Sequence, residues 1–204
     1  MHEIHSDEAT ALIAIKTSLV DPLAKLGGWN LASGSSHCTW DGVRCNARGV
    51  VTGLNLAGMN LSSTIPDDIL GLTSIVLQSN AFEHERPQAL VSIPSLLKEL
   101  DVANLQLLDL MCNRLKGGIP ASIGELPKLE VLELWNNSLT GPLPPSLGSA
   151  QPLQWLDVST NTISGPVAAG LCDSGNLTKL VLFNNVFAGP IPAGLHVLVA
   201  YPRS

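Results

Sequence analysis

Three acidic residues recur at equal spacing in the C-terminal half of the 204-residue chain, each between two apolar residues. They are Asp109, Glu133 and Asp157, with the same interval between successive members. If the fold stacks these segments, the carboxylates form a column of like charges that repel one another, and a cationic group of a partner relieves that repulsion. Trp135 and Phe183 flank this column, in a chain with only 4% aromatic residues. The spacing therefore predicts recognition of a basic partner.

Residues that could support catalysis or hold a cofactor show no such order. Serine, histidine and aspartate are scattered, without the GxSxG turn that presents a nucleophile. His2 and His5 form only an HxxH at the terminus, and no CxxC pair occurs. The net charge of −6 and the pI near 5.2 argue against nucleic acid, which requires a basic surface. The sequence predicts no enzyme, no metal site and no cofactor.

The four cysteines leave the redox compartment open. Cys38 and Cys45 are seven residues apart in a loop-like stretch, whereas Cys112 and Cys172 stand alone, and Cys172 is expected to be a free thiol. A disulfide between the first two implies a secretory compartment. Residues 1–8, however, carry neither a basic region nor an apolar core, so no signal peptide is expected. The apolar stretches fall short of the roughly 18 residues that indicate a membrane span.

An internal repeat carries these side chains. Four units in register begin with the pattern LxLxxNxL, with a conservative change in some units, and continue into a Gly-x-(Ile/Leu/Val) segment; they start at Leu108, Leu132, Leu156 and Leu180. Alternation sends the two apolar residues inward and the residues between and after them to the opposite face of a short parallel strand. A single unit cannot bury its leucines, but stacked units share one core. The sequence therefore predicts a solenoid.

The Asn, Gly and Pro of each unit are predicted to be structural. The recurring Asn stands where the chain leaves the strand, and its amide can bond backbone groups of adjacent turns that would otherwise be buried without partners. Gly permits the bend that follows, and Pro fixes its backbone.

The first units of the repeat are less regular. Units starting at Leu54 and Ile75 match the pattern weakly and follow each other at a shorter interval than the four regular units. Leu100–Val102 looks like the strand of a further unit, yet Leu108 begins the next unit only a third of a repeat later. We expect a bulge or a looped-out strand near residues 98–107.

The segment before the repeats is suited to cap the open end of a solenoid. Ser6, followed by two acidic residues, favours a helix start, and Leu12, Ile15 and Leu19 recur at helical spacing. Trp29 and the loop from Cys38 to Cys45 follow. Because the first turn of a solenoid has an unpaired apolar end, such a capping module is physically required.

These motifs resemble the plant leucine-rich-repeat receptor-like kinases. The block Cys38-x-Trp40-x-Gly42-Val43-x-Cys45 is similar to the N-terminal cap of that family, and the Gly-x-Ile-Pro segments are similar to its repeats, in which they add a second sheet. Residues 108–139 and 153–182 are most similar to the phloem-intercalated-with-xylem-like subgroup. The resemblance implies part of an extracellular ligand-binding domain. The kinase motifs of the family (a Lys–Glu pair, HRD, DFG) and the subgroup's Arg-x-Arg have no match in this chain.

The expected fold is α/β, a leucine-rich-repeat solenoid of the plant type with a parallel sheet on its concave face and an N-terminal helical cap. Residues 1–50 form the cap, residues 51–195 the repeats and residues 196–204 a non-repeat tail. The expected function is binding of a peptide or protein ligand, with a possible co-receptor, in cell-surface signalling on the extracellular side of the plasma membrane. The alternatives are a small secreted repeat protein that binds or inhibits another protein, and a degenerate product without activity.

The candidate site residues follow from alternation on the concave face and from short motifs. The ligand-binding candidates are Asp109, Met111, Glu133, Trp135, Asp157, Ser159 and Phe183. Cys38 and Cys45 are the disulfide candidates, and Asn60, Asn136 and Asn176 head Asn-x-(Ser/Thr) sequons for glycosylation. Without a C-terminal cap, the last strand leaves an open edge, so the isolated chain is expected to self-associate.

Overall fold

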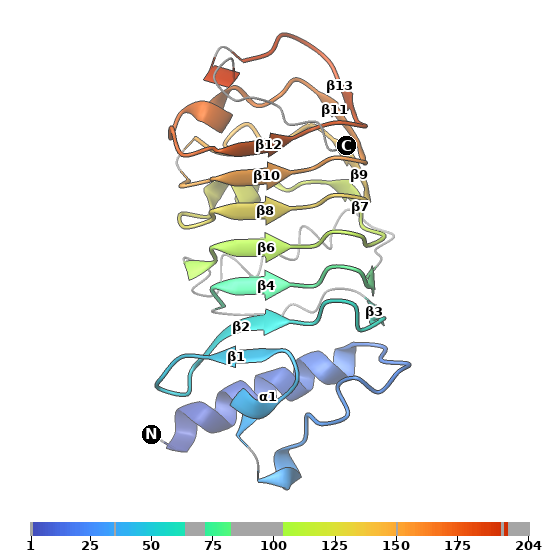
Figure 1. Ribbon diagram of the computed structural model, residues 1–204, viewed down its shortest axis with the longest axis vertical. Coiled ribbons are helices and arrows are strands. Elements are labelled where there is room, and N and C mark those ends of the chain that lie inside the picture. Colours follow the sequence, from blue (N-terminus) through green and yellow to red (C-terminus); the bar gives the residue numbers. More distant parts are fainter. Residues whose placement is uncertain are drawn as a thin grey trace.

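The computed structural model describes residues 2–34, 36–63, 72–82, 104–149, 151–192 and 194–195. The chain forms a solenoid in which short parallel strands stack along the long axis, with a helix beneath the first of them (Figure 1). The strand expected at residues 100–102 and the tail expected at residues 196–204 lie outside the described residues.

The main sheet contains one strand from each turn of the solenoid. Its order is β1 (Val43–Cys45), β2 (Val51–Asn55), β4 (Ser74–Val76), β6 (Leu107–Asp109), β8 (Val131–Glu133), β10 (Trp155–Asp157) and β12 (Lys179–Val181). All neighbours are parallel except β1 and β2, which are antiparallel. The leucines of the repeat lie in register, with Leu108 beside Leu132 and Leu132 beside Leu156.

Segments that follow the strands of the main sheet form further sheets on another side of the solenoid (Figure 1). One has the order β13 (Val186–Phe187), β11 (Thr162–Gly165), β9 (Ser138–Gly141) and β7 (Lys116–Gly118), and β3 (Ser62–Ser63) pairs with β5 (Ala81–Phe82). Short 3-10 helices complete the turns: η1 (Leu31–Ser33) and η2 (His37–Thr39) in the cap, and η4 (Ala121–Glu125) and η5 (Ala169–Cys172) in the repeats. The second sheet implied by the Gly-x-Ile-Pro pattern is thereby confirmed.

A ladder of asparagines joins successive turns, as the sequence predicts. Asn137 Nδ2 donates to the carbonyl oxygens of Leu110, in the preceding turn, and of Leu134, each at 3.0 Å, while its Oδ1 accepts from the backbone N–H of Leu115 at 3.1 Å. The other ladder residues repeat this pattern: Asn80, Asn113, Asn161 and Asn185. Each amide satisfies backbone groups at the corner where no strand partner reaches them.

The irregular turn lies between β4 and β6. Ile75 pairs directly with Leu108, just as Leu108 pairs with Leu132, although the first pair is separated by a longer stretch of chain than the second. The main sheet therefore continues from β4 to β6 without an intervening strand. The extra residues of this turn belong to 83–103, which lie outside the described part of the chain.

The cap is built on α1 (His2–Ser18) and on two stacked tryptophans. Leu12 and Ile15 of the helix are buried, and the rings of Trp29 and Trp40 stack with centroids 5.7 Å apart. Trp29 Nε1 donates to the carbonyl oxygen of Asp41 at 3.0 Å. Cys38 and Cys45 form a disulfide in the same part of the chain. The cap and the repeats share one continuous apolar core, which runs from Ala9 to Leu177.

Candidate binding site

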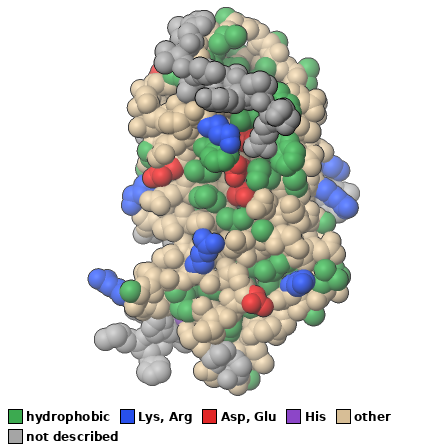
Figure 2. Space-filling model, in the orientation of Figure 1, with side chains coloured by type: hydrophobic (Ala, Val, Ile, Leu, Met, Phe, Trp, Pro, Cys, Tyr) green, Lys and Arg blue, Asp and Glu red, His purple; other side chains and the backbone are tan. Residues whose placement is uncertain are grey.

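The outward face of the main sheet presents three columns of side chains, because every second residue of a strand points the same way. Asp109, Glu133 and Asp157 stand side by side in the central column, as the strand register requires. In Figure 2, which shows this face, a short row of acidic side chains stands between apolar ones over the upper strands. The column predicted from the equal spacing of these residues is therefore present.

Two members of the acidic column and one neighbour are buried, against the expectation that they face a ligand. Asp109 is 5% exposed, Asp157 is 1% exposed and Ser159 is fully buried. The short aspartate side chains turn back to the backbone: Oδ1 of Asp109 accepts from the N–H of Met111, and Oδ1 of Asp157 accepts from both the N–H and the hydroxyl of Ser159. The expectation that these side chains are exposed is wrong, because each aspartate accepts from the N–H of the residue two positions later. A role for them as ligand contacts stays a prediction.

The longer side chains of the same columns reach the surface. Glu133, Met111 and Trp135 are partly exposed, and Phe183 is 54% exposed. The indole N–H of Trp135 donates to the hydroxyl of Thr160 at 3.3 Å, which fixes the ring across the neighbouring turn. Glu133 is therefore the accessible carboxylate of the acidic column, and it lies between aromatic and apolar side chains.

The third column was not among the candidates predicted from the sequence; it consists of Leu107, Val131, Trp155 and Lys179. Trp155 begins β10 and pairs with Val131 on one side and Lys179 on the other. The ammonium of Lys179 lies 3.2 Å from the centroid of the Trp155 ring, a cation–π contact. The same alternation that selects residues 157 and 159 also selects residue 155, so the signal was present in the sequence.

We define the sheet-face patch as the partly or fully exposed side chains Met111, Val131, Glu133, Trp135, Trp155 and Phe183. It combines one carboxylate with two indoles, a phenyl ring and two aliphatic groups. The ring of Trp155 already has the ammonium of Lys179 against it, so the accessible carboxylate of Glu133 is the group of the patch that suits a partner's cation. Such a surface fits a partner that presents a basic group next to apolar ones.

Burial raises the pKa of the Asp109 carboxyl above its ordinary value, and the N–H of Met111 offsets this only in part. The folded state therefore favours the protonated form more than the unfolded chain does. Ionisation of Asp109 therefore lowers the free energy of unfolding. This loss is absent below the pKa of Asp109 in the unfolded chain and grows as the pH rises through its pKa in the folded protein.

We expect Asp109→Asn to raise the melting temperature at neutral pH, because the amide keeps the oxygen that accepts from Met111 and removes the buried charge. The gain should shrink on acidification below the pKa of Asp109. Circular dichroism melts across a pH series check this, with Glu133→Gln, a more exposed carboxyl, as the control that should change less. A variant that is less stable at neutral pH would contradict the stated role of burial.

The sequons and the free cysteines lie at the margins of this face or away from it. Asn60, Asn136 and Asn176 are exposed, and their glycosylation stays a prediction. Asn136 directly follows Trp135 in the chain, and its Nδ2 lies 3.6 Å from the sulfur of Cys112. A glycan on Asn136 would therefore adjoin the sheet-face patch. Cys112 and Cys172 are free thiols. Among the described residues, no helix combines the length and apolar character needed to cross a membrane.

Comparison with known proteins identifies the parts of this architecture. The leucine rich repeat N-terminal domain family matches residues 5–46, and the leucine rich repeat family matches residues 104–126 and 128–150. A curated relative, MDIS1-interacting receptor like kinase 1 of Arabidopsis thaliana, is 45% identical over 100 residues. That alignment covers 48% of this chain and 10% of the relative, so the chain spans about a tenth of the relative's length.

Solved structures of plant proteins show the same solenoid fold. The ectodomain of the Arabidopsis receptor kinase HAESA, in complex with an N-terminal extended IDA peptide hormone ligand, superposes with a TM-score of 0.79 at 30% identity, covering 94% of this chain and 31% of that one. The BIR3–SERK2 complex of Arabidopsis thaliana gives 0.72 at 28% identity, covering 90% of this chain and 96% of that one.

Proposed function

Because the chain is a leucine-rich-repeat protein similar to plant receptor-kinase ectodomains, we propose that it binds an extended peptide or protein segment along the sheet-face patch. The partner presents a lysine or arginine to Glu133, and apolar side chains to Trp135 and Trp155. The observation that carries this proposal is the pair of partly exposed indoles on either side of a single accessible carboxylate.

Charge and shape both support an extended basic segment. The register of β6, β8, β10 and β12 repeats each surface feature once per strand, so a ligand that runs across the strands meets one new row of side chains at every step of about 4.8 Å. The buried Asp109 and Asp157 flank Glu133 and add negative potential at the base of the patch. Aromatic anchors around a charge are typical of the few residues that dominate binding energy.

The comparisons support the same class of partner. The HAESA ectodomain structure contains a peptide hormone ligand, and the second structure is a complex of BIR3 with SERK2. By this similarity we assign the chain to the extracellular side of the plasma membrane, as part of a receptor that signals through a kinase carried elsewhere. The Cys38–Cys45 disulfide supports an oxidising compartment. In this proposal the chain itself contributes binding, not catalysis.

Selection from a phage-displayed library of random linear peptides tests this proposal. Peptides enriched on the full chain should share a Lys or Arg next to aromatic or aliphatic residues. For such a peptide, Trp155→Ala should weaken binding by about 10-fold to 100-fold, as expected for an aromatic anchor, and Glu133→Gln by about 10-fold.

The matched control is Leu31→Ala, which removes a side chain that is 55% exposed in the cap, outside the patch. It should leave the affinity unchanged, and circular dichroism should show all variants folded. Enrichment of acidic peptides, or equal affinity for the wild type and the Trp155→Ala and Glu133→Gln variants, would overturn the proposal.

Self-association at the C-terminal end stays a prediction. Phe183, Val186 and Ile191 are all more than half exposed near the last described turn. These apolar side chains are the surface through which two copies would meet.

A further inference from the structure

We propose that Lys179, at the edge of the sheet-face patch, determines the specificity of the patch by binding the side-chain carboxylate of an aspartate or glutamate in the partner segment. This role rests on the proposed function and deepens it, because the partner then carries an acidic residue in addition to the basic one that Glu133 receives. The ligand class is an extended segment with two opposite charges at a fixed separation, in place of a purely basic segment.

Lys179 brings a positive charge to a face that otherwise carries carboxylates. In the three columns of outward side chains between β6 and β12, all of which the structure describes, Lys179 is the one cation. In Figure 2, a basic side chain lies on apolar ones next to the upper end of the acidic row. Glu133 belongs to β8, Trp155 to β10 and Lys179 to β12. Opposite charges therefore lie on the strands to either side of the Trp155 ring.

The contact with Trp155 holds the ammonium of Lys179 in place without neutralising it. The ammonium lies 3.2 Å from the ring centroid, and an aromatic face attracts a cation but carries no net charge. Within the described part of the chain, Lys179 forms no salt bridge. The side chain is partly exposed, so the ammonium N–H groups that do not face the ring can donate to an incoming acceptor. A cation that is already held loses less entropy when a carboxylate binds it.

The register of the main sheet sets the separation of the two charges. Lys179 pairs with Trp155, and the neighbouring column runs from Glu133 through Asp157 to Val181. Two strand spacings and two residues along a strand place Glu133 and Lys179 about 12 Å apart, and the lean of the ammonium over Trp155 shortens this distance. An extended segment advances about 3.4 Å per residue, so its basic and acidic residues are expected about two to four positions apart.

A purely covering role of Lys179 predicts the opposite effect of its removal. If the ammonium only shields the Trp155 ring, its loss frees the ring, and all peptides bind more tightly. If the ammonium binds a carboxylate, its loss weakens binding of the peptides that carry an acid and of no others. Lys179→Met separates the two roles, because methionine keeps a flexible apolar side chain on the ring and has no charge.

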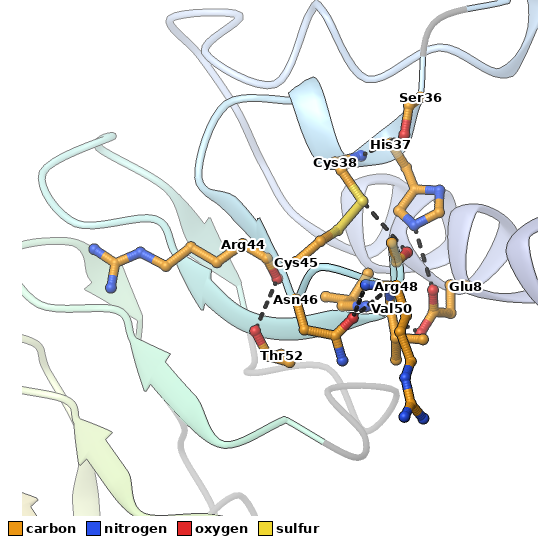
Figure 3. A network of polar contacts seen from close by, with 12 residues as sticks. Glu8, Ser36, His37, Cys38, Arg44, Cys45, Asn46, Arg48, Val50 and Thr52 are labelled. Atoms are coloured by element: carbon orange, nitrogen blue, oxygen red, sulfur yellow. Dashed lines mark hydrogen bonds and ion pairs between the residues drawn. A yellow bond between two sulfur atoms is a disulfide. The ribbon is translucent and has the colours of Figure 1, made fainter.

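Arg44 provides the matched control. It lies in the same column as Lys179 but at the other end of the sheet, where it pairs with Gly53 of β2. Its side chain is exposed, and Figure 3 shows it extending away from the polar contacts of the cap. Arg44→Met therefore removes one positive charge from the same face, outside the patch.

An array of synthetic peptides, measured on the full chain, tests the role of Lys179. Each probe has blocked ends and carries one lysine and one aspartate among leucines and tyrosines, at increasing separations, and its partner probe has asparagine in place of aspartate. Because the ends are blocked, the aspartate side chain is the one acid of the probe. At the expected separation the wild type should bind aspartate probes about 5-fold more tightly than asparagine probes. Lys179→Met should lose this preference, and Arg44→Met should keep it.

A charge exchange gives a readout that a merely structural role of Lys179 would not change. Lys179→Glu should favour probes in which a second lysine replaces the aspartate, and circular dichroism should show all variants folded. Three results would overturn the role of Lys179 and leave the proposed function standing, provided that Trp155→Ala still weakens binding. They are equal affinity of the wild type for aspartate and asparagine probes, a preference that survives Lys179→Met, and tighter binding of all probes by Lys179→Met. Failure of every probe to bind the wild type would overturn both.

Discussion

Replacing Asn137 by alanine is expected to lower the free energy of unfolding by about 3 kcal/mol, since three hydrogen bonds to backbone groups are lost at once. Its amide group donates to the carbonyls of Leu110 and Leu134 and accepts from the N–H of Leu115. These groups lie at the corner between two turns, where water cannot replace all of the lost partners. Urea unfolding followed by circular dichroism measures the loss.

The neighbouring residue provides the control. Asn136 is exposed and has a φ of 56°, a left-handed conformation that glycine adopts without strain. Asn136→Gly should therefore leave stability within about 0.5 kcal/mol of the wild type. If Asn137→Ala and Asn136→Gly changed the urea midpoint equally, the ladder would not be the element that joins the turns.

Trp29→Ala is expected to cost about 4 kcal/mol, the range for removal of a large buried aromatic side chain. Trp29 is 1% exposed, stacks on Trp40 and donates its indole N–H to the carbonyl of Asp41. Its removal leaves a cavity between α1 and the first strands, and in a solenoid the loss of a cap exposes the core of the next turn. The measurement is the thermal midpoint together with limited proteolysis of the cap.

Two further variants, Trp29→Phe and Leu31→Ala, test whether the stability loss comes from the tryptophan stack. Phenylalanine keeps part of the ring contact and loses the N–H, so an intermediate cost is expected. Leu31 is 55% exposed and should tolerate alanine. Equal stability of Trp29→Ala and Leu31→Ala would show that the tryptophan stack does not hold the cap.

The regular half of the solenoid could be predicted from sequence because its pattern encodes both the fold and the contacts. The LxLxxNxL spacing predicts inward leucines, parallel strands and an asparagine ladder, and the structure contains all three. The turn between Ile75 and Leu108 was harder to predict, since its length fits no regular repeat and Leu100–Val102 resembles a strand.

The sequence predicted where the side chains of the candidate site lie better than it predicted which of them are exposed to solvent. Alternation places Asp109, Glu133 and Asp157 in one column but does not distinguish a side chain that reaches the solvent from one that turns back. Aspartate is short enough to accept from the N–H two residues later, whereas glutamate extends past it. Side-chain length therefore decides which carboxylate of the column is accessible, and only Glu133 is.

Hydroxyl-radical footprinting tests the central claim that the sheet-face patch is the binding surface. Trp135, Trp155 and Met111 are partly exposed and oxidise readily, and Met59, in the first repeat outside the patch, serves as an internal reference. In the presence of a saturating library-selected peptide, oxidation of the three patch residues should fall while that of Met59 stays constant. Unchanged oxidation of Trp135 and Trp155 with the peptide bound would place the ligand elsewhere and contradict the account.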